Sequence, residues 1–141
     1  MGWRSGICSY RRRMFTVEQI EELHGRLGNA ETLSEYVRAL ADLGVERYES
    51  FVSDGHSEYF GHDAQRVSSV AVHDVLPVAG DSDRDAFLDQ LRRHELGETS
   101  YLEMSEGLAD SGVERWTVDT QAMTMTFHDR SGCVLLVEPI T

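Results

Sequence analysis

A nine-residue phrase occurs twice in this chain and constrains its fold more than any other feature. LADLGVERY spans residues 40–48 and LADSGVERW spans residues 108–116, with seven of the nine positions identical at an offset of 68 residues. Helix and strand signals on both sides of the phrase align at the same offset. We therefore predict two tandem copies of one α-α-β-β-β unit, related by a pseudo-twofold axis and sharing one core.

Each copy begins with two predicted helices. Apolar residues recur at helical spacing, and Ser or Thr followed three positions later by Glu or Gln forms a capping box at a helix start. Glycine ends the second helix of each copy because it adopts the left-handed conformation at little cost. The first helices span residues 16–27 and 83–96, and the second begin at the boxes Thr32–Glu35 and Ser100–Glu103 and end at Gly44 and Gly112.

Three predicted strands follow in each copy, marked by β-branched and aromatic residues and by alternation of apolar with polar side chains. They span residues 45–52, 56–61 and 66–73 in the first copy and 113–120, 123–128 and 133–138 in the second. The pair Asp54-Gly55 predicts a hairpin turn. Grouped helices and grouped strands favour an α+β fold, with an antiparallel sheet and helices packed on it.

The length of 141 residues is typical of one domain. We expect a single duplicated domain over residues 14–141, with repeat one at 14–73, a connector at 74–82 and repeat two at 83–141. Residues 1–13 are interpreted as a disordered leader or a misassigned start, because the first helix signal begins two residues after Met14. Two cysteines, Cys8 and Cys133, make no disulfide framework, and the absence of a secretion signal favours the cytoplasm. Cys133 falls in a predicted strand, where we expect it to be buried.

The net charge is −12, and residues 1–13 carry four arginines and no acid, so the remaining chain carries −16. Such a field repels phosphate backbones, which excludes nucleic acid as a partner of the domain. No run of 18 apolar residues is present, so we expect no membrane partner.

Several stretches resemble a family of small uncharacterised bacterial proteins, a domain of unknown function of which some members are labelled "phage envelope protein". They are MFTVEQIEELH, GVERYESFVSDGHSEYFG, GETSYLEMSEGLADSGVERWTVDTQAMTMTFHDRSG and VLLVEPI. The resemblance covers nearly all of residues 14–140 and implies a compact, duplicated α+β domain without an established activity. Its pattern includes Tyr48, Asp54, Gly55, His56, Tyr59, Trp116, Asp119 and Asp129.

Three aromatic residues are candidates for ligand binding. Tyr48 and Trp116 occupy equivalent positions in the two copies, and Tyr59 lies in the next strand of the first. In one interpretation they flank a cleft between the halves, where an apolar face with a polar tip suits a ligand. In the other they are core residues, because large aromatic side chains dominate cores.

Asp54, His56 and Asp119 are candidates for ligand contacts or for acid–base chemistry. Asp54 lies in the predicted turn, where aspartate commonly has a backbone role instead. His56 and His62 flank one short strand, about 20 Å apart if extended, so we expect no metal site. No phosphate-binding loop or nucleophile elbow is present, and we expect no cofactor.

A complete fold without a catalytic signature favours a non-catalytic binding or protein-interaction domain, as a monomer or a homodimer. Its partner would be a small molecule or a protein. The alternative is a small enzyme that uses His56 with Asp54 or Asp119 as acid and base.

Overall fold

A computed structural model describes residues 14–141, in which four α-helices and two short 3₁₀-helices accompany six strands. The expectation for residues 1–13 lies outside the described residues. The first part contains α2 (Val17–Leu27), η1 (Ala30–Thr32), α3 (Leu33–Leu43), β1 (Val45–Phe51), β2 (Ser57–Gly61), η2 (His62–Ala64) and β3 (Arg66–Ser68). The second contains α4 (Arg84–Glu95), α5 (Tyr101–Asp110), β4 (Val113–Asp119), β5 (Thr124–Asp129) and β6 (Val134–Pro139). The α+β class is confirmed.

Two of the predicted helix starts are capping boxes. At Thr16 and at Ser100 the hydroxyl accepts a bond from the backbone N–H three residues later. The side chain of that later residue, Gln19 or Glu103, accepts a bond from the backbone N–H of the capping residue. The predicted box at Thr32 is wrong. The Asn29 side chain accepts bonds from the backbone amides of residues 31 and 32 and so caps η1, which continues directly into α3. The Thr32 hydroxyl donates to the carbonyl of Leu27 at 2.6 Å instead of capping a helix.

The third strand of the first copy is shorter than predicted. β3 ends at Ser68, and the following segment lies along the hairpin turn instead, where Val72 N–H donates to the carbonyl of Asp54 at 2.9 Å. Cys133 precedes β6 in an exposed turn, so its predicted burial is wrong. The backbone N–H of Cys133 donates to Asp129 Oδ1 at 2.9 Å, and this bond closes the β5–β6 turn.

All six strands form one antiparallel sheet in the order β3-β2-β1-β4-β5-β6. At its centre, positions 47, 49 and 51 of β1 pair with 119, 117 and 115 of β4. The three β4 positions are the three β1 positions shifted by 68 residues, and they run in the opposite order. A twofold axis through the central pair, 49 and 117, requires this register. The duplication stays a prediction, to be tested by a rotation that places residues 32–60 on residues 100–128.

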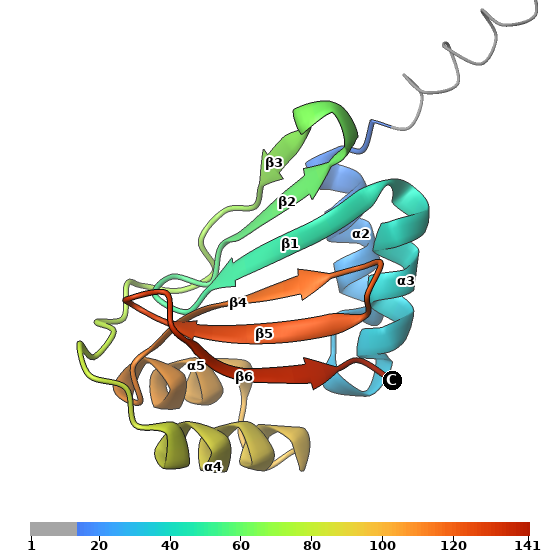
Figure 1. The fold of residues 1–141 in the computed structure, drawn as a ribbon. Coiled ribbons are helices and arrows are strands. Elements are labelled where there is room, and N and C mark those ends of the chain that lie inside the picture. Colours follow the sequence, from blue (N-terminus) through green and yellow to red (C-terminus); the bar gives the residue numbers. More distant parts are fainter. Residues whose placement is uncertain (1–13) are drawn as a thin grey trace, which may run out of the picture.

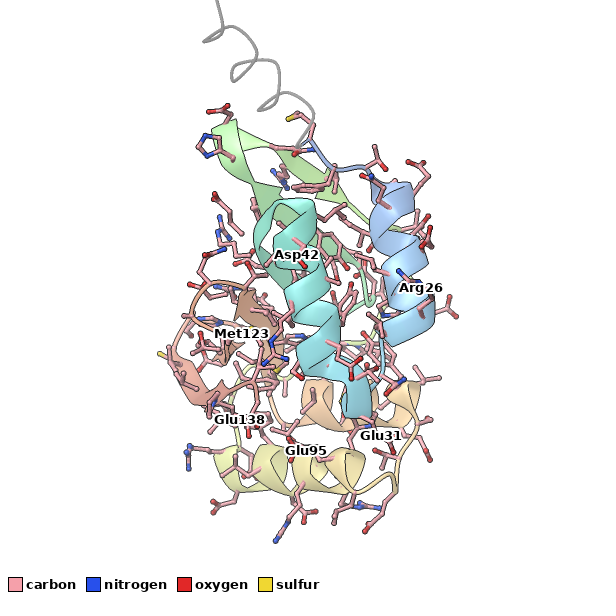
Figure 2. The ribbon with its side chains drawn as sticks, turned by 90° about the vertical axis from the view of Figure 1, so that its right-hand side faces the viewer. Arg26, Glu31, Asp42, Glu95, Met123 and Glu138 are labelled. Atoms are coloured by element: carbon pink, nitrogen blue, oxygen red, sulfur yellow. The ribbon has the colours of Figure 1, made fainter. Side chains whose placement is uncertain are left out.

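Both helix pairs pack on the same face of the sheet. Figure 1 shows the helices behind the strands and α4 beside the β6 edge, and Figure 2 shows α3 and α2 in front with the sheet to one side. Helices α2 and α3 bury Tyr48, Tyr59 and Val118, whereas α4 and α5 bury Val52, Val113 and Phe127. Because side chains alternate between the faces of a strand, the residues between these point to the face that carries no helix.

Candidate functional site on the uncovered sheet face

The face of the sheet opposite the helices, here called the open face, is polar and charged at its centre, and it also carries Phe51, Phe60 and Val137. Its side chains lie in rows that cross the strands, because directly paired residues share a face. It is formed by Arg47, Glu49 and Phe51 of β1, by His56, Glu58 and Phe60 at β2, by Arg115, Thr117 and Asp119 of β4, and by Thr124, Thr126 and His128 of β5.

A shallow hollow of about 370 Å³ lies in the open face. It extends over the three neighbouring strands β1, β4 and β5, so the first and the second part of the chain both contribute to it. Its lining contains two carboxylates, one guanidinium, one imidazole and three hydroxyls: Glu49, Asp119, Arg115, His128, Thr117, Thr124 and Thr126. Side chains of this composition can make hydrogen bonds and ion pairs rather than apolar contacts.

Glu49 lies on the β1 side of the hollow, opposite Thr117, and faces donors from two strands. Its Oε2 atom lies 3.7 Å from Arg115 Nε, 3.9 Å from Arg47 Nη1 and 3.5 Å from the Thr117 hydroxyl, which donates to it. Arg115 is held further by Glu114, whose Oε2 lies 3.0 Å from Nη1. The guanidinium is therefore fixed at one end of the hollow, with its side chain 24% exposed.

His128 lies beside Arg115 at the same end of the hollow, paired with it across the β4–β5 ladder. Burial, together with the nearby positive charge of Arg115, lowers the pKa of His128. Its Nδ1 atom is buried and has no hydrogen-bond partner within the described part of the chain. Since the neutral form is favoured, His128 has one donor and one acceptor nitrogen, and with Nδ1 buried it is Nε2 that is left for a ligand.

Asp119 marks the opposite end of the hollow, where β4 turns into β5. Its Oδ1 accepts bonds from the backbone N–H groups of Gln121 and Ala122, both at 2.9 Å. Among residues 14–141, Asp119 has no ion-pair partner. Its second carboxylate oxygen therefore carries negative charge on the rim of the hollow, and Asp119 pairs with Thr124 across the β4–β5 ladder.

His56 belongs to a separate cluster at the far end of the β1–β2 hairpin. Its Nδ1 lies 2.6 Å from Asp54 Oδ1, its Nε2 lies 3.3 Å from Glu58 Oε2, and its ring stacks on Phe51 at 4.5 Å. Burial disfavours the protonated imidazole and by itself would lower the pKa of His56. The hydrogen bonds and charges of Asp54 and Glu58 outweigh this effect, so the pKa of His56 is raised. Of the two predicted partners, the structure brings Asp54 to His56, whereas Asp119 lies in the hollow.

The aromatic candidates lie on the helix side. Tyr48 and Tyr59 are 5% and 4% exposed, with ring centroids 5.3 Å apart, and the Tyr59 hydroxyl lies 3.3 Å from that of Tyr36. Trp116 is partly buried and packs against both core clusters. These positions match the core interpretation of the aromatic residues.

Sequence reasoning missed Glu49, Arg115 and the β5 side chains of the hollow. The alternation in MTMTFH does place Thr124, Thr126 and His128 on one face of a strand. What the pattern does not supply is the pairing of β1 with β4, which brings Glu49 beside them.

No group of three or more His, Cys, Asp or Glu side chains in residues 14–141 could hold a metal ion. Within the same range, no helix has the length and apolar character needed to cross a membrane.

Comparison with known proteins identifies the family. Residues 21–139 match the family described as "Protein of unknown function (DUF1398)". The chain belongs to this family. The match includes every strand of the sheet and every residue of the hollow, so the open face lies within the DUF1398 domain. Comparison with curated proteins finds no match.

Proposed function

We propose that this DUF1398 protein is a non-catalytic binding domain of the cytoplasm whose ligand is a small polar molecule in the hollow of the open face. The observation that carries the proposal is the hollow itself, which lies at the centre of the face that no helix covers. Its lining offers both donors and acceptors from three strands. A rigid sheet holds these groups in fixed positions, which favours binding because little side-chain ordering is needed.

The edges of the sheet favour a monomer over a homodimer joined edge to edge. β3 is only three residues long, and short edge strands discourage pairing with another chain. At the other edge, the Arg84 side chain donates to the Leu135 carbonyl of β6 at 2.9 Å. The negative net charge of the domain disfavours nucleic acid as a partner, because it repels the phosphate backbone. A small molecule is favoured over a protein partner because the candidate contacts converge on one hollow.

Native mass spectrometry of the full chain, purified gently without chelator, tests the proposal. We expect an additional mass on the folded protein that is lost on denaturation. Thr117→Arg should abolish it because the longer side chain fills the hollow. Ser68→Arg is the matched control, since Ser68 is an exposed hydroxyl residue on β3 outside the hollow. A bare monomer in the native spectrum, or a bound mass that Thr117→Arg retains, would contradict the proposal.

The second candidate function is a small enzyme that uses His56 with Asp54, favoured by their contact of 2.6 Å. Against it, both ring nitrogens face carboxylates, and a doubly donating imidazolium has no lone pair for a proton. The two functions separate in His56→Ala. A binding domain keeps the bound mass, whereas an enzyme accumulates unconverted substrate.

A further inference from the structure

We infer that the ligand of the hollow is a short zwitterionic peptide, lying along β4 and β5 with its carboxylate at Arg115 and His128 and its ammonium group at Asp119. This inference rests on the proposed function and names the class of ligand. Three features of the lining support it: a donor end, an acceptor end, and a middle row of hydroxyls.

The donor end suits a carboxylate. The contacts of Arg115 with Glu49 and Glu114 use Nε and Nη1, so within residues 14–141 the Nη2 atom is left for a ligand. His128 lies next to it on the neighbouring strand. A guanidinium N–H together with an imidazole N–H can bind both oxygens of one carboxylate, and charge-assisted bonds of this kind are among the strongest in proteins.

The acceptor end suits an ammonium group. The turn amides occupy one oxygen of Asp119, and the other oxygen faces solvent without an ion-pair partner in the described range. Thr124 adds a hydroxyl oxygen directly across the ladder. A primary ammonium group has three donors, which a carboxylate oxygen and a hydroxyl satisfy in part while water completes the set.

The separation of the two ends sets the length of the ligand. Arg115 and Asp119 are four residues apart on one strand, about 13 Å between their Cα atoms at 3.3 Å per residue. Both side chains line the hollow, so a ligand that contacts their polar ends can be shorter than the distance between the two Cα atoms. An extended tripeptide spans up to about 10 Å, which fits, whereas a single amino acid cannot reach both ends.

The middle row suits amide groups. Thr117 and Thr126 pair directly across the β4–β5 ladder, and each hydroxyl can donate and accept a bond. The Thr117 hydroxyl already donates to Glu49, so its lone pairs face the ligand. Peptide N–H and C=O groups alternate along a chain and can use both kinds of partner. A ligand without amide groups leaves this row unused.

Triglycine is the probe, titrated into the ¹⁵N-labelled full chain and followed by NMR. We expect saturable shifts of the amides of Thr117, Thr124, Thr126 and His128. N-acetyltriglycine lacks the ammonium group and triglycinamide lacks the carboxylate, so each should bind at least about tenfold more weakly, the effect of one lost charge pair of moderate strength. Free glycine should show no saturation in the same range.

Two substitutions assign the ends. Asp119→Asn keeps the oxygen that caps the turn but removes the charge, so it should weaken triglycine about tenfold and leave N-acetyltriglycine unchanged. Arg115→Gln should remove the preference for triglycine over triglycinamide. Asp89→Asn and Arg92→Gln are matched controls, because these residues form an exposed pair on α4 and should change neither preference.

Each outcome decides the inference. Equal binding of triglycine and its blocked forms would show that the terminal charges are not recognised, and no saturable binding of triglycine would show that the hollow does not bind a peptide. Either result would overturn the zwitterionic peptide as the ligand. The proposed function is judged separately by the bound mass that Thr117→Arg removes, so it survives if that mass belongs to another kind of molecule. Shifts confined to residues outside the hollow would overturn the inference as well, because triglycine would then bind elsewhere.

Discussion

Glu49 and Thr117 face each other at the centre of the β1–β4 ladder, with the Thr117 hydroxyl 3.5 Å from Glu49 Oε2. The two residues are 68 positions apart, which is the offset of the repeated phrase. Arg47 and Arg115, also 68 apart, approach the same carboxylate oxygen from opposite sides. One carboxylate thus lies near two guanidinium groups that the predicted duplication makes equivalent.

Glu49→Gln should lower the free energy of unfolding by about 1 kcal/mol, because two guanidinium groups lose the carboxylate between them. The partial exposure of Arg47, at 48%, keeps the effect from being larger. Urea unfolding at pH 7 measures it. Glu22→Gln is the control, since its pair with Arg26 is 73% and 61% exposed and should cost almost nothing. Equal effects of the two substitutions would show that the central position of Glu49 has no energetic consequence.

The helix caps make a second prediction. Ser100→Ala should destabilise the protein by about 1 kcal/mol, and Ser100→Asp should restore most of the loss, because aspartate also accepts a bond from the amide of Glu103. In the first copy the sensitive cap should be Asn29 rather than Thr32, since Asn29 Oδ1 accepts two backbone bonds. Thermal unfolding of Ser100→Ala, Ser100→Asp and Asn29→Ala measures this. An Asn29→Ala variant as stable as the wild type would contradict the assignment.

Local patterns in the sequence predict the elements of this fold well because each pattern has a local cause. The glycine at position 44 has φ of 111°, and the one at 112 has φ of 86°, the left-handed geometry that the helix-end signal anticipates. Thr32 shows where such reasoning fails. Asn29, three positions earlier, caps a 3₁₀ turn that continues into α3, and the Thr32 hydroxyl bonds to the Leu27 carbonyl instead of capping the helix.

The candidate site is less predictable than the fold because it depends on the pairing of β1 with β4, two strands far apart in the sequence. Asp54, Asp119 and Asp129 all accept backbone bonds in turns, so their presence in the family pattern has a structural cause. His56 and Asp54 are two residues apart, and their contact is local. Glu49 and Thr117 meet only through the pairing of β1 with β4, and no local pattern marks either as a site residue.

His56 provides a prediction for pH. Its folded-state pKa is raised above the ordinary value of about 6.5, so its bonds to Asp54 and Glu58 stabilise the fold fully below that value. This stabilisation is lost as the pH rises through the raised pKa. His56→Gln should therefore destabilise the protein more at pH 5.5 than at pH 8.5, measured by urea unfolding. An equal loss at both pH values would show that the charge of His56 contributes nothing.

The two histidines of the open face should titrate on opposite sides of their ordinary pKa. Burial and the charge of Arg115 lower the pKa of His128, whereas the carboxylates raise that of His56. Protonation of His128 therefore opposes folding, and its contribution to stability falls as the pH drops from about 6.5 through the lowered pKa. The imidazole Cε1–H signals in NMR spectra report both titrations in one sample.

Triglycine should change only one of these titrations. A bound carboxylate beside His128 favours the imidazolium form, so saturating triglycine should raise the pKa of His128 toward its ordinary value. Triglycinamide has no carboxylate and should leave the pKa where it is. His56 lies in the separate cluster with Asp54 and serves as the internal control. A parallel shift of both histidines would indicate a general effect of the peptide on the fold, and an unchanged His128 would place the carboxylate elsewhere.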